Sequence, residues 1–423
     1  MVNITYIYHS VAAYSYHSII PFIMKTTTKL NAIFTVIIIV VILLNFGCKK
    51  VNSAAERVKI GNDELVVCDI YAITDTVTVP LSSLIEKLEI IRLDTARNAL
   101  FQSATGITIS EKYIGLSLYR PMSFKLFDRN GKYIRQIGSE GHGPSEYTNI
   151  SDAQISEANG EIYILPWSSD KILRFGIEGN AREPIMFPAQ SGSGRYNSPK
   201  GKFNVNPNGT VSVATLPMGR TLWGWIQDRE GNFLAKAELK SKINVDFSSE
   251  ISVSKNMGKF DPFMMIYGSK TNDTLFQFDY SEKRLVPRFT VKNIMDKKPP
   301  YYSYSEIPGY FLGEYSPGMV RVSETSSYAL PPKKFMINKK TLEGKYYNIV
   351  LDEFGDMPLG WYSFSEDYFI YNSSAIGLKT ILKEHLELNI VKDKATIDKL
   401  QKLHDSIDEE NDNNIIFLGK LKK

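Results

Sequence analysis

Residues 125–156, KLFDRNGKYIRQIGSEGHGPSEYTNISDAQIS, decide the fold that this sequence predicts. The first half of the segment predicts two short strands, 125–128 and 132–138, joined by a tight turn at 129–131. Asp128 and the glycine of that turn suit it, because an aspartate side chain bonds nearby backbone N–H groups and glycine tolerates positive φ. We therefore expect a β-hairpin here, followed by a Gly/Pro loop and the start of a further strand.

Weaker copies of this hairpin recur along the chain at a near-constant spacing. The marker is the aromatic or aliphatic residue before each turn, which is displaced by one place in the third copy; the marker positions are Phe127, Phe175, Gln227, Phe278 and Ile337. Two further strand candidates precede each hairpin, as at 153–155 and 161–165. Four short strands in a unit of roughly 40–50 residues are typical of a β-propeller blade.

These units predict five blades, at about residues 101–138, 149–187, 200–240, 250–291 and 310–350. A sixth can be assembled from 361–364, 368–371 and strands of the two chain ends, including 415–421 after a polar helix at 392–410. Pairing of terminal strands closes the ring and removes its open edges. We predict an all-β fold: a six-bladed β-propeller with a short C-terminal helix and ring closure by terminal strands. Seven blades, or a pair of β-sandwiches, are the alternatives.

The N-terminal part of the sequence predicts an export signal at residues 24–47. A short basic stretch, 25–29, precedes an apolar run at 32–44, and Cys48 follows directly afterwards. That order is typical of a secretory signal, and the run is short for a bilayer-spanning helix. A cysteine at this place indicates a bacterial lipoprotein, in which Cys48 would be acylated. An uncleaved membrane anchor is the alternative.

The remaining segments follow from that signal. Met24 begins a complete signal, so we interpret residues 1–23 as an upstream extension from a mis-assigned start codon. Residues 48–63 are polar and without periodicity, which indicates a tether to the lipid. Residues 64–423 then form a single propeller domain.

Composition argues against several classes of protein. The net charge is only +4 and basic residues are interspersed with acidic ones, so a nucleic-acid partner is not expected. With Cys48 acylated, Cys68 is the one cysteine left, which excludes an intrachain disulfide and suits a small buried residue. The histidines lie far apart in sequence, so neither a Cys/His zinc site nor any other metal or cofactor is predicted.

Several segments together resemble a known family. They are FDRNGKYIRQIGSEGHGPSEYTNISDAQI, the following NGEIYILPWSSDKILRF, the opening VPLSSLIEKLEIIRLDT and the closing DEENDNNIIFLGKLK. These segments resemble the six-bladed β-propeller lipoproteins of Bacteroidota, which are related in architecture to NHL-repeat propellers. The resemblance covers about residues 79–422, and Ser145 stands where the family more often has glycine. It implies a propeller fold, and most members of the family have no assigned biochemistry.

The loop at 138–147, GSEGHGPSEY, is the first candidate site. Glu140, His142 and Glu146 bring ionisable groups together, and a histidine between carboxylates can serve as an acid/base pair or bind a cation. The structural alternative is a connector between two blades in which Glu146 bonds loop amides. The glycine spacing is not a phosphate-binding motif, because no Gly-Lys-Ser/Thr follows.

Aromatic residues supply the other candidates. Trp167 and Asp170 follow an inner strand and could reach the pore or one face of the ring. Trp223 and Trp225 occupy alternate positions of one predicted strand, so we expect them to share a face. Two aromatic side chains on one face could form a sugar-stacking platform, or they could pack between blades.

Two functions remain open on the sequence alone. The first is a lipid-anchored binding or scaffold protein that presents a face or its channel to a glycan, a peptide or a partner protein. The second is a lyase or hydrolase with its site at the channel mouth. No G-x-S-x-G elbow or metal-ligand cluster occurs, so we expect binding rather than catalysis. The predicted location is the cell envelope, in the outer membrane, with the leaflet open.

Overall fold

The computed structural model describes most of the chain from Ser53 onward, as a single unit. The described residues are 53–119, 121–190, 194–243, 245, 249–266, 274–292, 302–322 and 327–423. The predictions for residues 1–52, namely the upstream extension, the signal peptide and the acylation of Cys48, fall outside the described residues.

The hairpin that led the sequence analysis forms the outer half of the first blade. This blade is a four-stranded antiparallel sheet of β5 (Ala104–Ile109), β6 (Tyr113–Tyr119), β7 (Met122–Asp128) and β8 (Tyr133–Ile137). The Asp128 carboxylate accepts bonds from the N–H groups of Asn130 (2.8 Å) and Lys132 (2.9 Å) in the turn. Gly131 has φ +84°, and a Cβ there would lie 2.1 Å from the Arg92 carbonyl oxygen. The predicted turn and its chemistry are confirmed.

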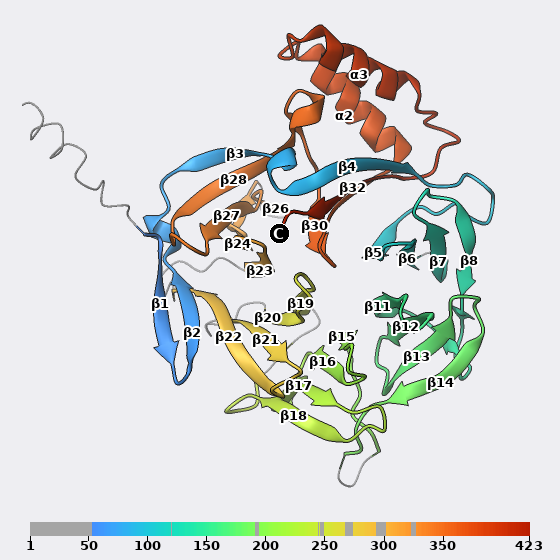
Figure 1. Ribbon diagram of the computed structural model, residues 1–423, viewed down its shortest axis with the longest axis vertical. Helices are drawn as coiled ribbons and strands as arrows, with labels where there is room; N and C mark the ends of the chain where they lie inside the picture. The colour runs from blue at the N-terminus through green and yellow to red at the C-terminus, as the bar shows by residue number, and fades with distance from the viewer. Residues whose placement is uncertain are drawn as a thin grey trace, which may run out of the picture. The chain divides into compact units, whose positions relative to one another are not determined.

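Two more blades repeat this four-stranded antiparallel pattern around the ring, whereas the fourth blade consists of two separate antiparallel strand pairs (Figure 1). The second blade consists of β11 (Ile150–Ser156), β12 (Glu161–Pro166), β13 (Lys171–Gly176) and β14 (Ala181–Met186). The third consists of β15 (Gly201–Val205), β16 (Val211–Thr215), β17 (Leu222–Gln227) and β18 (Phe233–Glu238). The fourth contains β19 (Glu250–Ser254), β20 (Asp261–Met265), β21 (Thr274–Asp279) and β22 (Arg284–Val291).

The fifth and sixth blades complete the ring. The fifth consists of β23 (Tyr302–Ile307), β24 (Tyr310–Tyr315), β27 (Lys333–Asn338) and β28 (Gly344–Leu351), with β29 (Met357–Pro358) at its edge. The sixth consists of β30 (Tyr362–Ser365), β31 (Tyr368–Ser373), β32 (Ile415–Leu421) and β4 (Ile85–Arg92). The sixth blade therefore joins both chain ends, which confirms six blades and closure by terminal strands. The fifth blade begins at Tyr302, earlier than predicted.

The segment before β4 supplies outer strands to two other blades. A hairpin of β1 (Ala55–Ile60) and β2 (Asp63–Cys68) adds β2 parallel to β22 of the fourth blade. Next, β3 (Thr76–Pro80) adds parallel to β28 of the fifth blade. Short 3-10 turns flank these strands at η1 (Ile70–Ala72) and η2 (Leu81–Ser83). The predicted tether at 48–63 is wrong from Ala55 onward, because that stretch pairs as a strand although its side chains are mostly exposed.

The helical part is larger than predicted. Two helices, α2 (Ala375–Glu387) and α3 (Lys394–Asp405), lie between β31 and β32. Sequence analysis found only the second. The Ser374 hydroxyl caps the first by accepting the Gly377 N–H (3.2 Å), and the helix buries Leu378 and Leu382 in the core.

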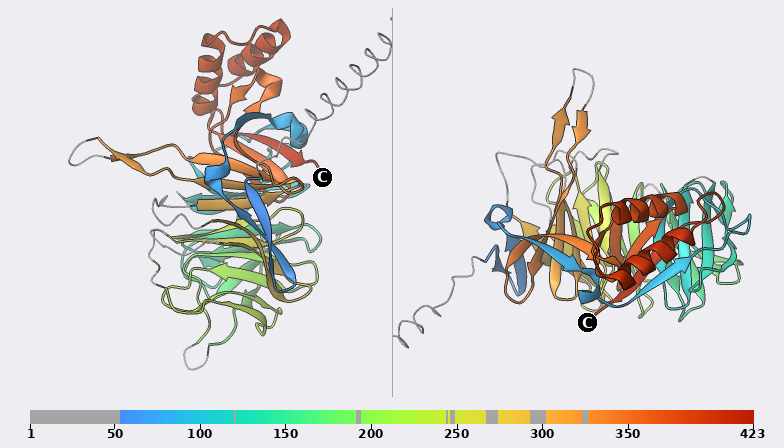
Figure 2. Two further views of the ribbon diagram at one scale, coloured as in Figure 1. Left: turned by 90° about the vertical axis from the view of Figure 1, so that its left-hand side faces the viewer. Right: turned by 90° about the horizontal axis from the view of Figure 1, so that it is seen from above.

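The remaining elements are short. They are the parallel pair β9 (Ser139–Glu140) and β10 (Glu146–Tyr147), the hairpin of β25 (Met319–Arg321) and β26 (Ser327–Ala329), and the turn η3 (Asp352–Phe354). Figure 2 shows the β25–β26 hairpin standing out from the ring.

The core lies between blades rather than within one of them. Each hydrophobic cluster combines residues of two neighbouring blades; Phe124 of the first blade, for example, packs with Ile162 of the second. Cys68 is fully buried in the cluster between the fourth and fifth blades, and burial raises the pKa of its thiol to about 12. The prediction of a small buried residue at Cys68 is confirmed.

Candidate ligand site in the central channel

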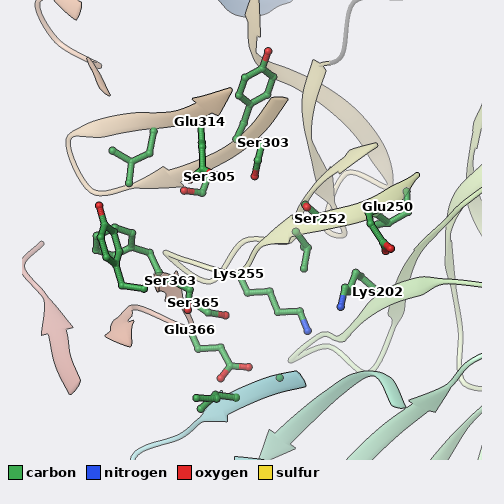
Figure 3. A pocket seen from close by; sticks show the side chains of 18 of the residues that line it. Lys202, Glu250, Ser252, Lys255, Ser303, Ser305, Glu314, Ser363, Ser365 and Glu366 are labelled. Atoms are coloured by element: carbon green, nitrogen blue, oxygen red, sulfur yellow. The ribbon is translucent and has the colours of Figure 1, made fainter. Parts of the chain in front are cut away.

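A cavity of about 480 Å³ lies in the central channel. The first strand of every blade contributes to its lining, namely β5, β11, β15, β19, β23 and β30. Figure 3 shows labelled side chains of β15, β19, β23 and β30 around one space. The cavity therefore combines segments from nearly the whole length of the propeller.

Serine hydroxyls cover the side of the cavity that the fourth, fifth and sixth blades form. They belong to Ser252, Ser303, Ser305, Ser363 and Ser365. The pairs on β23 and β30 occupy alternate positions, and alternate side chains of a strand point to the same face. This wall offers a row of groups that both donate and accept hydrogen bonds.

Charged side chains of both signs share the cavity with these hydroxyls. The acids are Asp152, Glu250, Glu314 and Glu366, and the bases are Lys202, Lys255 and Lys334. Lys255 donates to Asp152 (2.8 Å), which also accepts the Phe203 N–H (2.9 Å). The lining thus carries no strong excess of one sign.

Glu366 is an acid in the cavity whose pKa lies near neutrality. Its carboxylate accepts the Ile109 N–H (2.6 Å), which links the sixth blade to the first. Burial raises its pKa to about 7, although the charge of Lys255 opposes the shift. A carboxyl group with this pKa can take up and release a proton near neutral pH.

Two turns fix Glu366 in place. Glu366 and Asp367, in the β30–β31 turn, both have positive φ, as does Met257 in the β19–β20 turn. The Glu366 N–H donates to the Lys255 carbonyl oxygen (2.9 Å), the Asp367 N–H donates to the Asn256 amide oxygen (3.1 Å), and the Met257 N–H donates to the Asp367 carboxylate (2.5 Å). Left-handed backbone at residues other than glycine is uncommon and concentrates at functional sites.

A second charged cluster lies next to the channel, between the fourth and fifth blades. Buried Glu306 is contacted by Arg288 (2.9 Å), Lys259 (3.1 Å) and Lys339 (2.8 Å). Burial alone would raise the pKa of Glu306, but the hydrogen bonds and charge of Arg288 and the two lysines lower it to about 2. Nearby Asp261 is buried with no hydrogen-bond partner among the described residues for either oxygen, and burial and the charge of Glu306 raise its pKa to about 8.

The loop at 138–147 lies outside the channel lining. His142 is exposed, and the Glu146 carboxylate accepts the Gly143 N–H (2.8 Å). The Tyr147 hydroxyl donates to the Ile137 carbonyl oxygen (2.5 Å) and accepts the Phe124 N–H (2.9 Å). Glu146 therefore bonds a loop amide, as the structural alternative predicted.

Trp167 and Asp170 also lie outside the cavity lining. The Trp167 side chain is 41% exposed, and the Lys200 Nζ lies 5.5 Å from its ring centroid. Asp170 is half-buried, and its carbonyl oxygen accepts the Phe187 N–H (2.8 Å). Both residues lie in the connection from β12 to β13.

The prediction that Trp223 and Trp225 share a face is wrong. Trp225 packs with Phe187 between the second and third blades, whereas Trp223 packs with Phe278 between the third and fourth. The cause is a β-bulge in β17, where Trp223 has no partner opposite it in β18 and the alternation of faces shifts by one. Both side chains are buried, so they form inter-blade core and not a sugar platform.

Sequence analysis missed most of the residues that line the cavity, although one signal was present. The stretch YSYSE at 302–306 recurs as YSFSE at 362–366, and the two copies form β23 and β30 with their turns. Serines at alternate positions on the innermost strands of two neighbouring blades indicate a polar channel wall. No repeated sequence motif marks the lysines and the remaining acids of the lining.

Two absences hold for the part of the chain that the structure describes. No group of three or more His, Cys, Asp or Glu side chains is placed to hold a metal ion. In that same part, neither helix has the length and apolar character needed to cross a membrane.

The fold and the cavity together define a six-bladed β-propeller with a polar central channel. The chain belongs to the family described as Domain of unknown function (DUF4934), whose model matches residues 65–420. The resemblance to a propeller family without assigned biochemistry is therefore confirmed. Among curated proteins, none matches this sequence.

Solved structures share this architecture at low sequence identity. A protein of Bacteroides fragilis NCTC 9343, described as exported, has a TM-score of 0.56 and 14% identity over 83% of this chain and 99% of its own. A DUF4221-family protein of Bacteroides vulgatus ATCC 8482 has a TM-score of 0.44 and 12% identity, over 80% and 98%. Streptogramin B lyase has a TM-score of 0.36 and 13% identity, over 67% and 94%. The first likeness shows the fold alone, and the weaker two carry no argument about function.

Proposed function

We propose that this protein is a lipid-anchored, extracytoplasmic binding protein that holds a small polar ligand in its central channel. One observation carries the proposal: a single cavity of about 480 Å³ combines a wall of serine hydroxyls with acids and lysines of mixed sign. Small-molecule sites usually occupy about 300–1,000 Å³ and contain a few convergent polar groups. The cavity matches both features.

The shape of the site favours a small ligand over a folded partner. A cavity inside a ring admits a glycan unit or a short peptide, whereas a stable protein–protein interface needs about 800 Å² of surface on each partner. The hydroxyl, carboxylate and amino groups in the lining supply donors and acceptors for either ligand. Among the classes expected from the sequence, a small ligand such as a glycan or a peptide therefore fits the cavity better than a partner protein.

The location rests on separate observations. Cys48 directly follows the predicted export signal, and the structurally similar Bacteroides fragilis protein is described as exported. We expect palmitate labelling of the expressed chain, lost in Cys48→Ala, and accumulation of the precursor in the presence of globomycin. Unchanged labelling in Cys48→Ala would overturn the lipid anchor and leave the channel proposal untouched.

Ligand binding is tested with the mature chain from Cys48 onward, in which alanine replaces that cysteine. Glycan and peptide arrays identify a ligand, and titration calorimetry measures its affinity for the parent and for the double variant Ser303→Ala/Ser363→Ala. We expect the double variant to lose about tenfold or more in affinity, since each lost hydrogen bond is worth about 0.5–1.5 kcal/mol. Ser241→Ala, at an exposed serine outside the cavity lining, is the matched control. No saturable ligand, or equal affinity in all three proteins, would contradict the proposal.

Glu366 favours a second candidate, a lyase or hydrolase in the same channel. Its carboxyl group faces the cavity, its pKa is about 7, and two turns with left-handed residues hold its backbone. A general acid or base works best with a pKa near the operating pH. If an array ligand is converted, Glu366→Gln should abolish conversion while affinity changes little. Conversion at the parent rate in Glu366→Gln would exclude this role.

A further inference from the structure

The channel has a side arm between the fifth and sixth blades. Glu314 and Lys334 line it from the fifth blade, and Tyr362 lines it from the sixth. An outer cavity of about 400 Å³ shares Lys334, Tyr347 and Tyr362 with the channel lining. The arm therefore reaches from the serine wall toward the groove between the two blades, and Figure 3 shows Glu314 near Ser303 and Ser305.

Glu314 and Lys334 are a cross-strand pair that does not bond. They lie directly opposite each other in the antiparallel register of β24 and β27, so both side chains leave the same face of the sheet. Among the described residues, neither side chain makes a hydrogen bond or an ion pair, and Lys334 instead places its Nζ 3.9 Å from the Tyr362 ring centroid. The other charged pairs near the channel, such as Lys255 with Asp152, are in direct contact.

Both groups lose solvation without gaining an ionic partner. Burial raises the pKa of Glu314 and lowers the pKa of Lys334, and in each case the charge of the other residue opposes the shift. Removing a charged group from water is unfavourable unless a partner replaces the lost hydrogen bonds. A carboxylate and an amine with no ion pair between them thus line the same cavity, and each can take a ligand charge of opposite sign.

We propose that this side arm binds the α-amino and α-carboxylate groups of a free amino acid, with Glu314 accepting from the ammonium group and Lys334 donating to the carboxylate. The proposal rests on the channel being the ligand site and names the class of ligand. A zwitterion is electrically neutral, so both protein charges gain a partner without net charge entering the arm. Its side chain would then lie toward the serine wall, where hydroxyl groups supply hydrogen bonds.

The experiment is titration calorimetry of the mature chain with each of the common L-amino acids. We expect saturable binding of one or more of them. For the tightest, N-acetylation and methyl esterification should each weaken binding by about tenfold or more, because each modification removes one of the two charges. Absence of binding by every free amino acid would overturn the proposal.

Two variants assign the charges separately. The unmodified amino acid should bind to Glu314→Gln about tenfold more weakly than to the wild-type protein. Its N-acetyl derivative, which has no ammonium group, should bind to Glu314→Gln and to the wild-type protein with equal affinity. In Lys334→Met the methyl ester should likewise bind unchanged. Lys345→Met alters an exposed lysine of β28 that lines neither cavity, and it should leave every affinity unchanged. Amino-acid binding that is equal in Glu314→Gln, Lys334→Met and the parent would overturn the assignment.

The thermal unfolding temperature of each variant shows whether a loss of binding is caused by misfolding. Each variant removes a desolvated charge that has no ionic contact, so we expect unfolding temperatures equal to the parent's or higher. An array ligand whose binding is lost in Ser303→Ala/Ser363→Ala, together with no binding of any free amino acid, would retain the channel as the ligand site and overturn the amino-acid proposal. The serine variant therefore tests the channel as the ligand site, and Glu314→Gln tests the amino-acid proposal.

Discussion

Glu306 and Glu366 show how far the surroundings of a residue decide its chemistry. Both end the same repeated pentapeptide, YSYSE and YSFSE. Three cations contact Glu306 and hold its pKa at about 2, whereas burial raises the pKa of Glu366 to about 7 against the opposing charge of Lys255. The first glutamate stabilises the contact between two blades, and the second faces the cavity as a group able to exchange a proton.

Asp261→Asn is predicted to change how stability depends on pH. The folded-state pKa of Asp261, about 8, lies above its ordinary value of 3.8, so the carboxyl costs stability progressively as pH rises between those values. Relative to the wild-type protein, the asparagine variant should gain stability over that interval, by several kcal/mol at its upper end, because one pKa unit corresponds to about 1.4 kcal/mol. Urea unfolding at pH values below, within and above the interval measures this difference. An Asp261→Asn difference that does not vary with pH would contradict the assignment, and Asp170→Asn serves as the control.

Truncation of Trp225 is predicted to lower the unfolding free energy far more than truncation of Trp167. Trp225 is 1% exposed and packs against Phe187, with ring centroids 5.1 Å apart, so Trp225→Ala should cost about 3–5 kcal/mol of unfolding free energy. Trp167 is 41% exposed, and Trp167→Ala should stay within about 0.5 kcal/mol. Denaturant unfolding of both variants is the measurement. Equal, small effects would show that Trp225 is not part of the core.

At the scale of elements, the N-terminal strands tie the ring together. β2 and β3 cover the outer edges of the fourth and fifth blades, and β4 completes the sixth. Open edges invite pairing with other chains, so these strands protect the propeller as well as closing it. Sequence analysis assigned strands of the chain ends to the sixth blade, but it interpreted 48–63 as a tether and so missed β1, whose side chains are mostly exposed.

Truncation separates these roles. A chain that begins at Asp94 lacks β1 to β4 and should aggregate or unfold at a much lower temperature, because the fourth and fifth blades lose their covering strands and β32 loses its partner. A chain that begins at Asp63 lacks only β1 and should remain monomeric with little change in unfolding temperature. Size-exclusion chromatography and thermal unfolding compare the two. Equal behaviour of the Asp94 chain and the full mature chain would refute closure by β4.

At the scale of the molecule, local signals predicted the fold better than the site. Turn chemistry such as that of Asp128 acts within a few residues and is visible in sequence, as is the alternation within each strand. The bulge at Trp223 depends on pairing between β17 and β18, and α2 is stabilised by burial against the sixth blade, so neither has a strong local signal. The cavity requires six inner strands to converge, and only the Ser-rich repeat of β23 and β30 marks it in sequence.

The central claim is that the channel is the ligand site, and a crystal structure of the mature chain with its array-selected or calorimetrically selected ligand tests it most directly. We predict ligand density in the cavity among β19, β23 and β30, in contact with the serine wall and within reach of Lys255 or Glu366. Density for the same ligand on the outer surface of the ring, with the cavity unchanged, would contradict the claim.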